Sequence, residues 1–138
     1  WIDSKMGGRR QCREPPAQQE LKMPNYMLLL HTNPSRPRPT SPDEIMAITK
    51  AYMDWADRMR ADGRLKGGEK LTFDAGKVMR PNGGRVTVTD GPYAESKELI
   101  GGYFAISARN YDEACRIAES CPHLGFGGTI EVRQVDHM

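Results

Sequence analysis

The chain between residues 89 and 104 reads Thr89-Asp90-Gly91-Pro92-Tyr93-Ala94-Glu95-Ser96-Lys97-Glu98-Leu99-Ile100-Gly101-Gly102-Tyr103-Phe104. A strand pattern runs into Asp90-Gly91-Pro92. Asp-Gly is a turn dipeptide because glycine permits a positive φ and the Asp side chain accepts a backbone hydrogen bond. Proline fixes its own φ and restricts the residue before it. The stretch therefore predicts a loop that is rigid at its start, ionisable in its middle, and followed by a new strand.

The segment from Asp90 to Glu98 resembles the D-G-P-F-A-E-[TS]-K-E signature of the DGPF branch of the YCII-related family, with Tyr93 in place of the usual Phe. Other pieces match the family in order: Gly67-Gly68-Glu69, Gly101-Gly102-Tyr103, Cys121-Pro122-His123-Leu124 and Ile130-Glu131-Val132-Arg133. The resemblance covers residues 26 to 135 and implies a ferredoxin-like α+β domain that pairs into a dimeric α/β barrel.

Periodicity along the chain predicts the same element order. Expected strands cover residues 26–30, 64–73, 103–108 and 129–135, expected helices cover 41–63 and 110–121, and a hairpin joins 77–80 to 85–89 around Pro81-Asn82-Gly83-Gly84. Gly67-Gly68 is expected to interrupt the second strand, as a bulge or a close approach of chains. The resulting order, β-α-β, hairpin, β-α-β, is the split arrangement of a ferredoxin-like sheet.

Both predicted helices carry clear end signals. Ser41 suits the N-cap of the first, Pro42 its first turn and Glu44 the capping-box position, while Gly63 suits the left-handed C-terminal position. Its expected buried stripe is Ile45, Ile48, Tyr52, Trp55 and Met59. In the second helix Asn110 is the expected N-cap, Pro122 the stop, and the buried stripe is Ala114, Ile117, Ala118 and Cys121.

The run Tyr26-Met27-Leu28-Leu29-Leu30 is apolar without alternation. Such a run is typical of a strand buried on both faces. A small α+β domain covers one face of its sheet with its own helices, so the other face needs a partner. The run therefore predicts a homodimer.

Composition narrows the function classes. The chain has 138 residues, the length of one domain. Of its 20 basic and 18 acidic residues, five and three fall within the first 22, which leaves 15 of each. The rest of the chain lacks the basic excess of nucleic-acid binders, and no apolar run is long enough to span a membrane. Three cysteines without a C-x-x-C pair favour a reducing, cytoplasmic location.

Residues 1–22 are polar, lack apolar periodicity and do not begin with Met. They are expected to be a disordered leader or an expression remnant. A basic arm that touches a partner is the competing interpretation. The single domain is expected to occupy residues 23–138.

The last strand places Glu131 and Arg133 on the face opposite Ile130 and Val132. We expect the apolar pair to pack on the helices and the charged pair to point toward the barrel interior, a side that Met27, Leu29 and His31 can share. One interpretation is a structural Glu131–Arg133 ion pair. The other is an anion site in which Arg133 binds the ligand and Glu131 orients it.

Asp90 has two interpretations, an Asx-turn acceptor that fixes the loop and a general base. The resemblance implies an Asp–His mechanism with Asp90 in the Asp position, but the first helix lacks the His that some branches place near it. His31, at the end of the first strand, is the best substitute. A histidine there can equally be a hydrogen-bonded structural residue.

The remaining candidates are weaker. His123 follows the predicted end of a helix, where the helix dipole favours a protonated imidazole. Lys97 can hold an anion, or pair with Glu95 and Glu98 as a surface cation. Three scattered histidines without close carboxylates give no metal signature, and neither glycine pair forms a phosphate-binding fingerprint, so no cofactor is expected.

Three functions follow. The first is an enzyme or ligand-binding domain for a small anionic molecule. Asp90 and His31 supply acid/base chemistry, and Arg133 and Lys97 hold the anionic group, with Glu131, Glu95 and His123 nearby. The second is a regulatory or interaction module, since the resemblance implies a link with alternative sigma factors. The third, a cofactor-free oxygenase, rests on analogy with other dimeric α/β-barrel proteins.

Overall fold

The computed structural model describes residues 23–91 and 98–136. The strands are β2 (Asn25–Thr32), β3 (Leu65–Lys70), β4 (Lys77–Asn82), β5 (Arg85–Asp90), β6 (Leu99–Ser107) and β7 (Thr129–Gln134). The helices are α2 (Pro42–Ala61), α3 (Tyr111–Glu119) and α4 (Pro122–Gly125).

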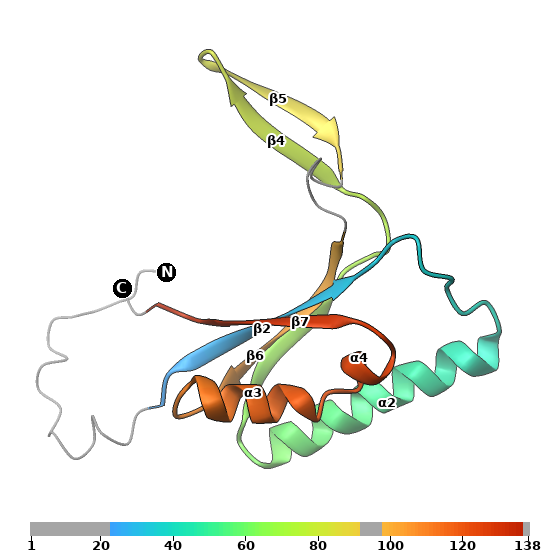
Figure 1. Ribbon diagram of the computed structural model, residues 1–138, viewed down its shortest axis with the longest axis vertical. Coiled ribbons are helices and arrows are strands. Elements are labelled where there is room, and N and C mark those ends of the chain that lie inside the picture. Colours follow the sequence, from blue (N-terminus) through green and yellow to red (C-terminus); the bar gives the residue numbers. More distant parts are fainter. Residues whose placement is uncertain (1–22, 92–97, 137–138) are drawn as a thin grey trace, which may run out of the picture.

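Four strands form one antiparallel sheet in the order β3-β6-β2-β7. Helices α2, α3 and α4 lie on one side of this sheet (Figure 1). Each helix-containing connection joins two strands that have one other strand between them: β6 lies between β2 and β3, and β2 lies between β6 and β7. This is the split β-α-β order. The predicted α+β class is confirmed, and the strand order is that of a ferredoxin-like sheet.

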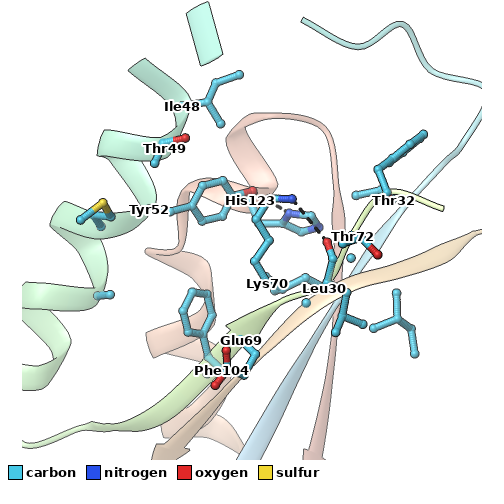
Figure 2. Close-up of a pocket in the computed structure, with 18 of the residues that line it drawn as sticks. Leu30, Thr32, Ile48, Thr49, Tyr52, Glu69, Lys70, Thr72, Phe104 and His123 are labelled. Carbon is cyan, nitrogen blue, oxygen red and sulfur yellow. Dashed lines mark hydrogen bonds between the residues drawn. The ribbon is translucent and has the colours of Figure 1, made fainter. Parts of the chain in front are cut away.

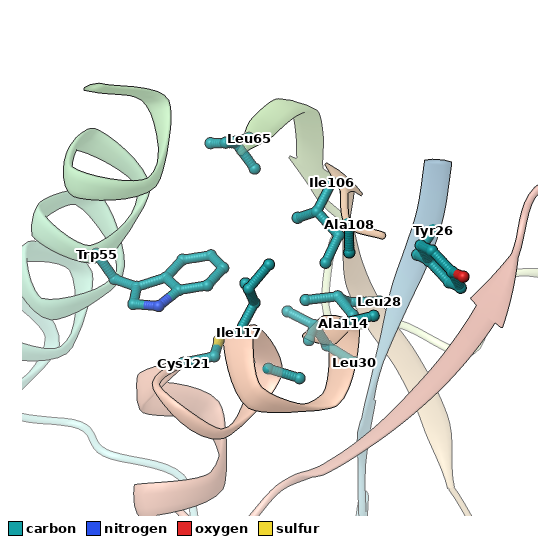
Figure 3. Close-up of a cluster of buried hydrophobic side chains, with 11 residues drawn as sticks. Tyr26, Leu28, Leu30, Trp55, Leu65, Ile106, Ala108, Ala114, Ile117 and Cys121 are labelled. Carbon is teal, nitrogen blue, oxygen red and sulfur yellow. The ribbon is translucent and has the colours of Figure 1, made fainter. Parts of the chain in front are cut away.

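The core fills the space between the sheet and the helices (Figure 3). Trp55 of α2 is fully buried, and its ring lies 4.9 Å from that of Phe104 on β6, centroid to centroid. The indole N–H donates to the Ser120 hydroxyl at 2.8 Å. The other buried apolar residues are Tyr26, Leu28, Leu30, Leu65, Ile106, Ala108, Ala114, Ile117, Ala118 and Cys121. One aromatic side chain thus joins α2 to both the sheet and the end of α3.

The predicted helix ends are largely correct. The Ser41 hydroxyl accepts from the Glu44 N–H at 3.2 Å, and the Asn110 side chain accepts from the Glu113 N–H at 2.9 Å. Gly63 has a φ of 74° after the Asp62 C-cap. One detail was wrong: α3 ends at Glu119, and Pro122 begins the short helix α4 instead of simply stopping α3.

The predicted stripe of α2 is buried only in part. Trp55 is buried, while Ile45, at the helix start, is 46% exposed. Tyr52 and Met59 are partly buried against the core. The first half of α2 therefore faces the sheet without being packed on it.

Within one protomer the strand β2 is buried on one face only, and burial of its other face by a second copy stays a prediction. Tyr26, Leu28 and Leu30 are buried beneath the helices, whereas Met27 and Leu29 on the other face are partly exposed. The strand alternates in burial although it does not alternate in hydrophobicity.

The expected irregularity of the second strand is present as a shift of register between Leu65 and Gly67, although β3 continues through both glycines. Close approach explains Gly68 but not Gly67, where a Cβ would meet no atom within 4 Å. A Cβ at Gly68 would lie 2.6 Å from the Tyr103 carbonyl oxygen, and one at Gly102 would lie 2.8 Å from the Glu69 carbonyl oxygen. Both positions lie where β3 meets β6.

The hairpin β4–β5 forms a sheet of its own and projects away from the four-stranded sheet (Figure 1). Its turn is Gly83-Gly84, both with positive φ, which suits a two-residue hairpin turn. Met79 pairs with Val88, and Pro81 with Val86, on one face. Met79, Val86 and Val88 are 66%, 60% and 55% exposed. The hairpin therefore carries an apolar face that the protomer leaves uncovered.

Candidate functional site

A pocket of about 440 Å³ lies between α2 and the sheet, and its helix lining runs from Ile48 to Arg60 (Figure 2). Its apolar walls include Leu30, Ile48, Met53, Leu71, Leu99 and Phe104, and its polar lining includes Thr32, Arg38, Thr49, Tyr52, Lys70, Thr72 and His123. Trp55 is the buried residue of α2, and helix residues both before and after it line the pocket.

Tyr52 and His123 form a hydrogen-bonded pair in the wall of this pocket. The His123 Nε2–H donates to the His31 carbonyl oxygen at 2.9 Å, and Nδ1 lies 2.8 Å from the Tyr52 hydroxyl. Because a carbonyl can only accept, Nε2 carries the proton, and in the neutral ring Nδ1 accepts from the Tyr52 O–H. Gly128 provides the space for the imidazole, since a Cβ there would overlap the ring.

Burial keeps both groups neutral. It lowers the pKa of His123, because desolvation disfavours the imidazolium, and it raises the pKa of Tyr52 to about 12. The expectation that the helix dipole would favour protonated His123 was wrong. His123 is the second residue of the four-residue helix α4 and is only 5% exposed. Desolvation of its ring therefore outweighs the helix dipole.

The free energy of unfolding is expected to decrease as the pH falls from about 7.5 to 5.5. In the unfolded chain His123 has its ordinary pKa of about 6.5, which is higher than its pKa in the folded protein. The contribution of neutral His123 to the free energy of unfolding is therefore complete above about pH 6.5 and is lost as the pH falls below it. Urea unfolding at several pH values, followed by circular dichroism, measures this slope. His123→Gln is expected to be less stable but to have a flatter slope. An unchanged slope in this variant would contradict the assignment.

The other face of the sheet carries a second polar cluster. His31 donates from Nε2 to Glu131 at 2.9 Å, and Arg133 donates to the same carboxylate at 3.4 Å. Glu98 lies 3.9 Å from Nδ1 of His31. The hydrogen bond from His31 lowers the pKa of Glu131.

The register confirms the prediction for this face. Met27 lies opposite Arg133 and Leu29 opposite Glu131, while Ile130 and Val132 pack against the core. A shift of register between Leu30 and His31 marks a bulge of β2 against β6. The bulge lies at His31, whose carbonyl oxygen accepts from His123 and whose ring donates to Glu131.

Asp90 lies at the end of β5, outside the pocket. Its side chain is 81% exposed and accepts from Lys77 Nζ at 2.5 Å, across the base of the hairpin. Gly91 packs against Ala75 so closely that a Cβ would overlap the Ala75 carbonyl oxygen. In the protomer, the described start of the signature therefore closes the hairpin. The candidates Glu95 and Lys97 lie outside the described residues.

The comparisons with known proteins agree with this architecture. A family model described as YCII-related domain matches residues 25–138. The chain belongs to the YCII-related family. An uncharacterized protein of Rhizobium meliloti (strain 1021) is 29% identical over 91 residues, which are 65% of this chain and 68% of that protein. The name of that protein states no activity.

Sequence reasoning about this YCII-family domain missed three polar residues of the pocket, Tyr52, Lys70 and Arg38. Tyr52 was assigned to the buried stripe because its spacing from Trp55 is that of a core position, and Lys70 and Arg38 were not singled out. Helical spacing identifies a face, but it does not reveal that the helix stands off from the sheet. The polar hydroxyl of Tyr52 within an apolar stripe was the available signal, since a buried Tyr O–H usually has a partner.

Three further features concern the residues that the structure describes. Residues 23–91 and 98–136 contain no group of three His, Cys, Asp or Glu side chains arranged to hold a metal ion. Within the same ranges, no helix is both long enough and apolar enough to cross a membrane. Cys115 is exposed and Cys121 buried, and both are free thiols.

Proposed function

We propose that this YCII-family domain binds a small molecule in the pocket between α2 and the sheet. The supporting observation is a cavity of about 440 Å³ with largely apolar walls and the Tyr52–His123 pair in its lining. Small-molecule sites typically have about this volume, apolar walls and a few fixed polar groups. A bound molecule would also cover exposed apolar side chains of α2 that line the pocket, such as Met53.

Blocking the pocket tests this function. Thr49 lines the pocket and is exposed, so Thr49→Trp is expected to fill the entrance without disturbing the core. Ala47→Trp, an exposed position on α2 that does not line the pocket, is the matched control. In a fragment screen by ligand-observed NMR, binding is expected to weaken at least about tenfold in Thr49→Trp only. Fragments that bind both variants equally would place the site elsewhere.

The homodimer remains part of the proposal. Met27, Leu29 and Tyr103 share the sheet face opposite the helices with His31 and are partly exposed in the protomer. Pairing two sheets would cover this face and produce the barrel. Light scattering after size exclusion is expected to give twice the chain mass, and Leu29→Lys is expected to give the monomer. A monomeric parent at micromolar concentration contradicts the dimer.

Acid/base chemistry, if the domain is an enzyme, is better supported at His31 than at Asp90. His31 is held by Glu131 on the face that the dimer would enclose, whereas Asp90 is solvated and paired with Lys77. Asp90→Asn is accordingly expected to leave fragment binding in the α2 pocket unchanged. The same NMR screen detects any loss, which would restore Asp90 to the site.

The uncovered apolar face of the hairpin favours a second candidate, a regulatory or interaction module. Met79 and Val88 are exposed at adjacent paired positions. The parent and Met79→Lys can each be cross-linked in cell extract, and the proteins attached to each can be compared. The interaction module predicts that Met79→Lys loses partners, and identical sets of attached proteins would contradict it. The free thiols of Cys115 and Cys121 support a cytoplasmic location for either function, which a fluorescent fusion would test.

A further inference from the structure

Positively charged side chains outnumber negatively charged ones among the described residues that line the pocket. Arg38, Arg60 and Lys70 line it, against Glu69 as the carboxylate among the described lining residues. Arg60 donates to Asp57 at 3.1 Å, so its charge is partly neutralised on the helix surface. Arg38 and Lys70 remain as the cations that can serve a ligand.

Lys70 is directed into the pocket. Its position on β3 pairs with Gly102, on the side of the sheet that faces the helices. In Figure 2 the side chain extends from β3 in the direction of Tyr52 and His123. Its ammonium group donates to the Leu71 carbonyl at 3.4 Å, a long hydrogen bond that leaves further N–H groups for a ligand.

Arg38 is held in place by stacking. Its guanidinium lies 3.6 Å from the centroid of the Phe73 ring, and Phe73 also lines the pocket. Stacking uses the flat face of the guanidinium and leaves its N–H edge for hydrogen bonds. The segment that carries Arg38 is also tied down nearby, because Arg36 donates to the Gly127 carbonyl.

The rest of the pocket is apolar or neutral. Ile48, Met53, Leu99 and Phe104 form its walls, and the Tyr52–His123 pair carries no charge because His123 is held neutral. An apolar cavity with an amine and a guanidinium at its edge matches a molecule with an apolar body and a single anionic group.

We propose that the ligand of the α2 pocket is an amphipathic carboxylate, with its apolar body between α2 and β6 and its carboxylate held by Lys70 and Arg38. This inference rests on the proposed function, since it specifies the ligand class for the same pocket. A planar guanidinium edge and one ammonium match the two oxygens of a carboxylate. The same two side chains can also bind a phosphate monoester, so a phosphate probe is included in the test.

A matched pair of probes tests the ligand class: 2-naphthoate and 2-naphthamide have the same shape and differ in charge. Calorimetric titration of the full chain is expected to give at least about tenfold tighter binding of the carboxylate, because hydrogen bonds to charged groups are the stronger ones. Lys70→Met is expected to weaken naphthoate binding about tenfold and to change naphthamide binding less than about twofold. Lys66→Met, an exposed position on the same strand outside the pocket, is the control and is expected to bind both probes like the parent.

The outcomes separate the two proposals. Equal affinity of the two probes, or naphthoate binding that Lys70→Met does not weaken, overturns the carboxylate assignment while Thr49→Trp still abolishes binding in the pocket. Tighter binding of 2-naphthyl phosphate than of naphthoate also overturns it. If no probe or fragment binds in a manner that Thr49→Trp prevents, the proposed function itself fails, and the ligand class fails with it.

Discussion

Replacing Trp55 by alanine is expected to lower the free energy of unfolding by about 3–5 kcal/mol, the range for deleting a buried large aromatic side chain. Trp55 is the buried residue of α2, and its indole N–H satisfies the Ser120 hydroxyl. The change removes the contact with Phe104 and opens a cavity between helix and sheet. Urea unfolding followed by circular dichroism measures the loss.

Two controls separate packing from hydrogen bonding. Trp55→Phe keeps an aromatic ring but loses the N–H, and is expected to cost less than the alanine change. Met53→Ala, on the same helix and 60% exposed, is expected to cost under about 0.5 kcal/mol. A Trp55→Ala variant as stable as Met53→Ala would show that α2 is held to the sheet elsewhere.

A methyl group at residue 128 is expected to have the second largest effect. The Cβ of Gly128→Ala would overlap the Nε2, Cε1 and Cδ2 atoms of His123. The ring is buried and bonded at both nitrogens, so it cannot move without losing its contacts with Tyr52 and the His31 carbonyl. We expect a loss of about 2–4 kcal/mol, from overpacking and from unsatisfied polar groups.

Gly125→Ala is the matched control for this change. Gly125 lies three positions earlier, and a Cβ there meets no atom within 4 Å. Chemical denaturation of both variants is expected to show a large loss for Gly128→Ala and almost none for Gly125→Ala. Equal losses would mean that the backbone of this segment, and not the space for His123, sets the requirement for glycine.

Local rules predicted much of the fold because they depend on neighbours in sequence. The caps at Ser41 and Asn110 involve an N–H three residues away, and the Gly83-Gly84 turn involves the two residues between its strands. The shared face of Glu131 and Arg133 follows from the alternation of a strand. Each of these features needs only the period of one element.

Features that depend on the distance between elements could not be predicted in this way. Tyr52 and Trp55 have the spacing of one stripe, yet one lines a pocket and the other lies in the core. His123 was assigned by its place after a helix, whereas its pKa depends on burial beneath β2 and β7. The likeness of the Asp90 segment to a family signature indicated the family correctly but did not indicate how exposed Asp90 would be.

The tautomer of His123 determines what a bound molecule can offer to Tyr52. Because the phenolic hydrogen is already committed to the imidazole, the oxygen presents only lone pairs to the cavity. A molecule that touches this oxygen must bring its own hydroxyl, amine or amide hydrogen, and a bare ketone or ether gains nothing there. Protonation of the imidazole would reverse this polarity, because Nδ1–H would then donate to the phenolic oxygen and the phenol O–H could donate to the bound molecule.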